Sequence, residues 1–300
     1  MLEKELYFSV GRWHILLMKA NTAFEGIHLH VGDCVKGMAN LVPDQSIDVV
    51  VTSPPYNLGI KYASYSDQLS KEAYLGWTAE WARQVARCLK SDGSLFLNIA
   101  GSHKQPLLPH QVVNMLVDEL KIFRLQNTIH WIKSIAMKGD DGVVKQRGHY
   151  KPVNSSRFVN DCHEFIFHLT PEGTTPLDRL AVGIPYADKS NIARWGHTSG
   201  QDLKCMGNTW FIPYKTISRR AIDRPHPATF PTAVATQCIK LHGKNGSSVV
   251  MDPFLGIGHS ALAAAECKVA GFIGFDIERS YVEISRDELI ELGTSPTIHL

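Results

Sequence analysis

Strand-like and helix-like segments alternate through residues 1–135 and again through residues 226–300, and this alternation constrains the fold more than any other feature. Residues 46–52 form a β-branched run that two prolines stop, which is typical of a buried strand. Apolar side chains recur at helical spacing over residues 70–89, which predicts a helix. By the same criteria, strands are expected at residues 94–99, 127–132, 164–169, 248–251 and 271–276, and helices at residues 108–120, 232–241, 259–267 and 280–292. Such alternation predicts an α/β protein with a doubly wound, mostly parallel sheet.

The middle of the chain, residues 136–225, has a different character. It is polar, contains many Gly, Pro and Asn residues, and shows no clear period apart from the strand expected at residues 164–169. Between Lys133 and Pro225 there are 14 Lys and Arg against 9 Asp and Glu, which leaves 17 against 20 for the rest of the chain. A basic region on a slightly acidic body suits contact with a polyanion, although a solvated basic loop has the same composition. We therefore predict three segments, in which residues 1–135 and 226–300 form one α/β domain and residues 136–225 are inserted between them.

The composition argues against several classes of protein. The six cysteines are scattered without a CxxC pair, which argues against a zinc knuckle and a disulfide framework and fits a reducing cytosol. Neither a signal-peptide layout nor an early apolar stretch of bilayer length is found, so a cytoplasmic location without membrane contact is expected. His163, Glu164 and His168 are spaced HExxxH rather than the HExxH of zinc hydrolases, and no metal site is predicted.

The segment from Asp252 to Gly258, Asp-Pro-Phe-Leu-Gly-Ile-Gly, lies between an expected strand and an expected helix. Glycines at such a turn let a ligand approach the backbone, and the N–H groups of the helix N-terminus favour an anionic group. Asp276 follows at the end of the next expected strand, where a carboxylate can accept hydrogen bonds from ribose hydroxyls. The spacing Gly256-x-Gly258-x-x-Ala261 also fits a nicotinamide dinucleotide site, but too few residues follow Gly258 for the rest of a dinucleotide fold. A cofactor loop is therefore predicted here, with a ligand-free tight turn as the alternative.

The segment Thr52-Ser53-Pro54-Pro55-Tyr56-Asn57 includes the end of the strand expected at residues 46–52 and the turn after it. Two prolines fix the backbone and remove two N–H donors, so carbonyl groups remain as acceptors. Ser53 adds a further acceptor and Tyr56 an aromatic face, which together suit a planar base that carries an amino group. A Pro-Pro sequence is usually only a turn, but the carboxyl end of a parallel strand is where open α/β sheets bind ligands.

Together these motifs resemble those of the S-adenosylmethionine-dependent DNA amino-methyltransferases that modify cytosine N4 or adenine N6. The similarity is to the circularly permuted group of that family, in which the catalytic motif precedes the cofactor loop. It extends over nearly the whole chain, through residues 32–34, 48–57, 89–98, 131–133, 163–167, 226–231 and 252–258. One departure is Gly258-His259-Ser260, where the family often has Gly-Thr-Thr. The resemblance implies a permuted, Rossmann-like methyltransferase fold in which residues 136–225 read the DNA sequence.

The resemblance also implies roles for individual residues. The catalytic set would be Ser53, Pro54, Pro55 and Tyr56. Ser53 and the Pro54 carbonyl would accept hydrogen bonds from the target amino group, and Tyr56 would stack on the flipped base. The cofactor would be S-adenosyl-L-methionine, with its ribose bound by Asp276, its adenine edge reached by Asp33, and its methionine portion held by the loop at residues 254–258. The cofactor site as a whole would comprise Asp33, Thr229, Phe230, Asp252, Phe254, Gly256, Gly258 and Asp276.

These roles imply a site-specific enzyme that flips a base out of double-stranded DNA and methylates its exocyclic amino group by direct in-line transfer. Serine in the first position of the Pro-Pro motif is more typical of cytosine-N4 enzymes in this family, so cytosine N4 is favoured over adenine N6. There are two alternatives. One is an RNA or protein methyltransferase, against which the basic middle region argues. The other is a non-catalytic DNA-binding protein, against which the intact motifs argue. Double-stranded DNA is the expected partner, with Arg219 and Arg220 among the expected contacts. A homodimer and a cognate restriction endonuclease stay open at this point.

Overall fold

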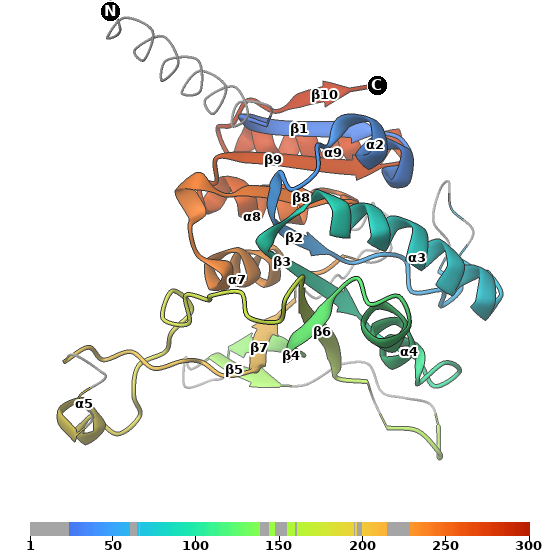
Figure 1. Ribbon diagram of the computed structural model, residues 1–300. Helices are drawn as coiled ribbons and strands as arrows, with labels where there is room; N and C mark the ends of the chain where they lie inside the picture. Colours follow the sequence, from blue (N-terminus) through green and yellow to red (C-terminus); the bar gives the residue numbers. More distant parts are fainter. Residues whose placement is uncertain are drawn as a thin grey trace, which may run out of the picture.

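Figure 1 shows the computed structural model of the chain. It describes residues 24–60, 65, 67–138, 144–147, 155–159, 161–194, 196, 200–214 and 229–300. Arg219, Arg220 and residues 226–228, which entered the argument from sequence, lie outside the described residues.

The described residues form one sheet of ten strands, in the order β10-β1-β9-β8-β2-β3-β6-β4-β5, with β7 beside β4. The strands are β1 (Gly26–Val31), β2 (Ile47–Thr52), β3 (Leu89–Ile99), β4 (Arg124–Lys138), β5 (Val144–Arg147), β6 (His163–Thr170), β7 (Thr209–Pro213), β8 (Val249–Asp252), β9 (Gly271–Asp276) and β10 (Thr297–His299). Every neighbouring pair from β10 to β3 is parallel. Strand β6 is antiparallel to both β3 and β4, β5 is antiparallel to β4, and β7 is parallel to β4. The predicted doubly wound, mostly parallel sheet is confirmed.

Helices cover both faces of this sheet (Figure 1). They are α2 (Cys34–Leu41), α3 (Lys71–Cys88), α4 (Leu108–Asn114) with the π-helical turn Met115–Glu119, α5 (Ser190–Arg194), α7 (Thr232–His242), the 3₁₀ turn Asn245–Ser247, α8 (His259–Glu266) and α9 (Arg279–Glu291). In β3, Leu95 and Leu97 belong to the apolar core with α2, α3 and α4, whereas Phe96 belongs to the core with α7, α8 and α9. Because both faces are covered, all 6 residues of β2 are buried. None of the helices in the described ranges combines the length and apolar character needed to cross a bilayer.

Four strands of the sheet were not expected from sequence: β1, β5, β7 and β10. Strand β7 lies in a stretch that was interpreted as irregular, yet Trp210 and Ile212 are buried and its backbone pairs with β4. Residues 136–225 thus contribute β5, β6 and β7 to the sheet. The division of the chain into three segments stays a prediction, and any DNA-reading surface in the middle segment would be built on these strands and the loops between them.

Two buried histidines make the stability of this fold depend on pH. His168 Nε2 and His242 Nδ1 lie 3.0 and 2.9 Å from the hydroxyl oxygen of Ser94. Burial lowers the pKa of His168 to about 3. Below about pH 6.5 the unfolded chain therefore binds a proton that the folded chain does not, and the free energy of unfolding falls by about 1.4 kcal/mol per pH unit.

Urea titrations of the wild type and of His168→Gln, at about pH 7.5 and 5.5, test this expectation. The wild type should lose more stability than the variant over this interval, because only the wild type has a histidine at this position to protonate on unfolding. Equal losses in the two proteins would contradict it.

Candidate active site

The carboxyl ends of four neighbouring parallel strands, β1, β9, β8 and β2, meet at one edge of the sheet. Most of the predicted site residues lie at this edge: Asp33 after β1, Ser53 after β2, Asp252 at the end of β8 and Asp276 at the end of β9. The predicted catalytic and cofactor motifs meet where Thr52 Oγ1 donates a hydrogen bond of 2.6 Å to Asp252 Oδ1. Open α/β sheets bind ligands at such an edge.

Asp252 connects the two motifs from inside the protein. Its side chain is 1% exposed, and burial raises its pKa to about 6. Its Oδ1 accepts from Thr52 and from the backbone N–H of Phe254, and its Oδ2 accepts from Ser260 Oγ at 2.6 Å. Both carboxylate oxygens are thus bonded within the protein, so the side chain fixes β2, the start of the glycine loop and helix α8 relative to one another.

Asp276 holds the far side of the glycine loop. Its Oδ2 accepts from the backbone N–H of Gly256 and its Oδ1 from that of Glu278, both at 2.8 Å. Burial raises the pKa of Asp276 to about 6. The loop then enters α8 at Gly258, whose φ of +86° and close approach to Ser285 leave no space for a side chain.

Asp33 lies one strand away from Asp276, because β1 and β9 are paired and the Gly32 N–H donates to the Asp276 backbone carbonyl at 2.8 Å. Its Oδ1 accepts from the Lys36 N–H at 2.9 Å, which caps the N-terminus of α2. The side chain is exposed, so it remains accessible at the sheet edge.

Aromatic side chains back the cofactor loop. The Phe254 ring contacts the rings of Trp77 and Trp81 from α3 edge-on, at centroid distances of 5.4 and 5.5 Å. Phe230 is 8% exposed and packs in the core with α7 and α8, next to the half-buried Thr229. Its carbonyl lies 2.5 Å from His259 Nδ1. His259, which stands where the family often has threonine, thus connects the segment at residues 229–230 to the start of α8.

The turn after β2 is held in place by a buried carboxylate and a tyrosine. Asp67 is 2% exposed and accepts backbone hydrogen bonds of 2.8–3.0 Å from Asn57, Leu58 and Ile60. The Tyr74 hydroxyl donates to the Pro55 carbonyl at 2.9 Å. The backbone of the predicted catalytic motif is therefore held by hydrogen bonds within the protein.

The Ser53 and Tyr56 side chains belong to a hydrogen-bonded cluster with residues from three other strands. Ser53 Oγ lies 2.6 Å from the Tyr56 hydroxyl, which donates to Glu164 Oε2 on β6 at 3.1 Å. Asn98 Nδ2 on β3 donates to the Tyr56 hydroxyl and to Glu164 Oε2, both at 2.7 Å. Lys133 Nζ on β4 lies 2.9 Å from the other oxygen, Glu164 Oε1. The Tyr56 hydroxyl is thus hydrogen-bonded to the Glu164 carboxylate.

Asn98, Glu164 and Lys133 were not identified as site residues from the sequence. A signal existed, because Asn98 is a polar residue in the apolar run at residues 95–99 and Glu164 directly precedes the apolar residues 165–167. The signal did not say that the two strands are neighbours, which follows only from the sheet order.

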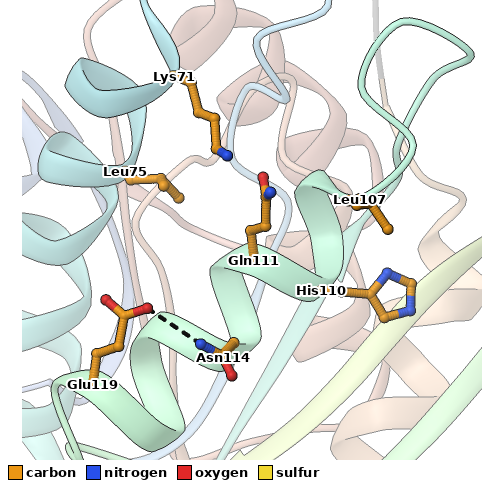
Figure 2. A pocket seen from close by; sticks show the side chains of 7 residues that line it. All are labelled: Lys71, Leu75, Leu107, His110, Gln111, Asn114 and Glu119. Carbon is orange, nitrogen blue, oxygen red and sulfur yellow. Dashed lines mark hydrogen bonds between the residues drawn. The ribbon is translucent and has the colours of Figure 1, made fainter.

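A cavity of about 460 Å³ lies between α3 and α4, away from these motifs (Figure 2). It is lined by Lys71, Leu75, Leu107, His110, Gln111, Asn114 and Glu119. None of the predicted catalytic or cofactor residues lines it, so the candidate site is defined by the side chains at the strand ends and not by this cavity.

Two curated relatives resemble most of this chain. It is 27% identical over 257 residues to the type II methyltransferase M.HpaI of Haemophilus parainfluenzae, covering 86% of this chain and 72% of that protein. It is 31% identical over 255 residues to the type II methyltransferase M.BglII of Bacillus subtilis, covering 81% of this chain and 64% of that protein.

Solved structures share the fold. The cytosine-N4-specific PvuII DNA methyltransferase matches with a TM-score of 0.63 at 19% identity, covering 87% of this chain and 88% of that one. A DNA modification methylase of Thermus thermophilus, solved in complex with S-adenosyl-L-methionine, matches with a TM-score of 0.59 at 22% identity, covering 91% and 97%. The family model described as DNA methylase, which covers N6 and N4 methyltransferases, matches residues 47–287. The chain therefore belongs to the N6/N4 DNA methylase family.

Proposed function

We propose that this chain is a site-specific DNA methyltransferase that transfers a methyl group from S-adenosyl-L-methionine to the exocyclic N4 amino group of cytosine in duplex DNA. The observation that carries this proposal is the hydrogen bond of 2.6 Å between Thr52 and Asp252. It brings Ser53 and the glycine loop to the same edge of the sheet. A base held by Ser53 and a cofactor held by the loop would meet there.

The residues at this edge fit S-adenosyl-L-methionine. Asp276 and Asp33 offer carboxylates at the ends of adjacent strands for the ribose and the adenine edge. The glycine loop brings backbone close to a ligand, and the partly exposed Phe254 ring, which packs on Trp77 and Trp81, suits a sulfonium cation. When bound, the cofactor supplies a methyl group on a sulfonium centre, which is already activated for displacement. Asp252 would act by shaping the loop, since it is buried and its oxygens already accept three hydrogen bonds. Asp276 is only partly buried and accepts one bond on each oxygen, so it can still accept from a ligand.

The catalytic turn would act on the target amino group. The lone pair of that group is delocalised into the base, which makes the nitrogen a poor nucleophile. Ser53 and the Pro54 carbonyl would accept its hydrogens, draw them out of the ring plane and stabilise the positive charge that grows on nitrogen. Pro55 would hold the turn, because its carbonyl already binds Tyr74. Tyr56 would stack on the flipped base with its ring.

Cytosine N4 is our first choice of target and adenine N6 the second. The serine of the Ser-Pro-Pro-Tyr motif and the fold likeness to a cytosine-N4-specific enzyme support cytosine. The family includes methyltransferases for both positions, which keeps adenine as the specific alternative.

Double-stranded DNA is the proposed macromolecular substrate, and the basic segment at residues 136–225 its proposed reader. Neutralising phosphates with Lys and Arg would make binding strongly salt-dependent. The names of the type II relatives support a role beside a restriction endonuclease. A cytoplasmic location and a homodimer are further parts of the proposal.

The test is to incubate the chain with methyl-labelled cofactor and duplex DNA, and to digest the DNA to nucleosides for mass spectrometry. N4-methylcytosine is the expected product. N6-methyladenine would replace the first choice by the second. Label that appears only in RNA or protein substrates tested in parallel would refute the DNA assignment.

Asp276 gives cofactor binding a predictable pH dependence. The ionised carboxylate is the better acceptor for ribose hydroxyls, and burial raises its pKa to about 6. The affinity for S-adenosyl-L-methionine should therefore be highest well above pH 6, where Asp276 is ionised. Below pH 6 it should fall by up to about tenfold for each pH unit. Asp276→Ala should weaken binding by about 1.5–3 kcal/mol at pH 7.5 and remove this dependence.

Calorimetry with S-adenosyl-L-methionine checks both statements, and Asp287→Ala on the exposed side of α9 is the matched control. Unchanged affinity in a folded Asp276→Ala variant would refute the ribose assignment.

A further inference from the structure

The cluster around Tyr56 contains groups with fixed hydrogen-bonding roles. A carboxylate only accepts hydrogen bonds, whereas an ammonium group and an amide nitrogen only donate them. Glu164 is therefore the acceptor for Lys133, Asn98 and Tyr56, as the distances of 2.9, 2.7 and 3.1 Å indicate. Its side chain is 14% exposed, so these contacts are largely shielded from water.

These roles set the direction of the contact between Ser53 and Tyr56. A tyrosine hydroxyl carries one hydrogen, and here it is donated to Glu164. At the distance of 2.6 Å between the two hydroxyl oxygens, Ser53 must then be the donor and Tyr56 the acceptor. Asn98 Nδ2 also donates a long hydrogen bond of 3.4 Å to Ser53 Oγ, so one lone pair of Ser53 is left to accept a hydrogen bond from another molecule.

We propose that Ser53, Tyr56 and Glu164 form a proton relay that removes the proton released by methyl transfer, with Glu164 as its terminal acceptor. The proposal rests on the amino-methyltransferase function above and adds the fate of the proton to it. Glu164 acts through Ser53 and Tyr56, so it is a positioning residue as well as the end of the relay.

The relay balances without any further reagent. The methylated nitrogen is positively charged, and one of its N–H bonds breaks while its electron pair stays on nitrogen. The proton forms a bond with Ser53 Oγ, the hydrogen of Ser53 passes to Tyr56, and the hydrogen of Tyr56 passes to Glu164. The products are a neutral methylated amino group and a neutral carboxylic acid, which later releases its proton to solvent.

Lys133 and Asn98 support the relay from both sides of Glu164. Lys133 Nζ donates to Oε1 at 2.9 Å, which leaves Oε2 to Tyr56 and Asn98. Asn98 is 2% exposed and donates through Nδ2 to both Tyr56 and Glu164, which holds these two side chains next to each other. Its Oδ1 is buried and has no hydrogen-bond partner among the described residues.

The pH dependence of the chemical step tests the relay. The single-turnover rate of the wild type should fall at low pH, because a protonated Glu164 cannot take another proton. Glu164→Gln keeps the shape and an acceptor for Tyr56 but cannot accept a proton, so its rate should fall about tenfold and lose this acidic limb. Affinities for cofactor and DNA should stay unchanged, since a relay affects kcat and not binding.

The same experiment distinguishes a pH dependence caused by Glu164 from one caused by other titratable groups nearby. The rings of His130 on β4 and His163 on β6 lie 5.5 Å apart, and Asp161 precedes β6. All three remain in Glu164→Gln, so a limb that they cause would survive the substitution. Glu172→Gln, at an exposed position in the turn after β6, is the matched control and should behave as the wild type.

Tyr56→Phe provides a second route if Glu164→Gln does not fold. It keeps the aromatic ring and breaks the relay between Ser53 and Glu164, so the limb should again be lost. A wild-type rate with an unchanged limb in either folded variant would overturn the relay while leaving the proposed function intact. Absence of any methyl transfer to DNA by the wild type would instead overturn the proposed function and the relay with it.

Discussion

Replacement of Ser53 by alanine is expected to slow methyl transfer about ten- to a hundredfold at saturating DNA and cofactor. The Ser53 hydroxyl matters most as positive charge builds on the target nitrogen, so its loss raises the barrier more than it weakens binding. We expect a cost of about 1.5–3 kcal/mol, because the Pro54 carbonyl remains as a second acceptor. Single-turnover methylation and the melting temperature are to be measured on the same preparation.

The competing explanation is that Ser53 only stabilises the turn through its contact of 2.6 Å with Tyr56. In that case Ser53→Ala would lower the melting temperature and leave the transfer rate nearly unchanged. Ser46→Ala is the matched control, since its hydroxyl also bonds within the protein, to the Pro43 carbonyl at 2.7 Å, just before β2 begins. It should change neither the rate nor the affinity, and a stable Ser53→Ala variant with the wild-type rate would refute the catalytic role of Ser53.

Gly258→Ala is expected to destabilise the protein strongly and to disrupt the cofactor loop. The backbone at Gly258 has a φ of +86°, which costs a residue with a side chain about 1–2 kcal/mol. A Cβ there would lie 1.9 Å from Ser285 Oγ and 2.6 Å from Ser285 Cβ, so α9 or the loop must shift. Overpacking of this kind adds about 1–3 kcal/mol. Urea denaturation should therefore show a loss of about 2–5 kcal/mol, and calorimetry a weaker cofactor.

Two further variants separate the causes of this loss. Gly76→Ala, at an exposed position inside α3 with open space around its Cβ, should stabilise the protein by about 0.5–1 kcal/mol. Combining Gly258→Ala with Ser285→Gly should remove the clash and leave the strain of the positive φ, so the two substitutions should not be additive. Additive losses would mean that Ser285 does not limit the space at Gly258.

Much of the candidate site follows from local sequence. Two prolines after a buried strand predict a rigid turn, and glycines between a strand and a helix predict a loop that a ligand can approach. Both motifs lie at the predicted edge of the sheet, where the Thr52–Asp252 hydrogen bond joins them. The three residues that complete the cluster, Asn98, Glu164 and Lys133, come from separate strands and could not be placed by any local pattern.

The sequence by itself determined the alternation of strands and helices and the two motifs, because periodicity, proline and glycine act on the backbone within a few residues. Only the tertiary structure decided that β6 lies between β3 and β4, which brings Glu164 to Tyr56 across 108 positions of the chain. Only the tertiary structure also revealed β1 and β7, whose strand state depends on pairing with β9 and β4. The physical reason is the same in both cases: backbone pairing and contacts between side chains far apart in sequence depend on the order of strands in the sheet, which no short segment encodes.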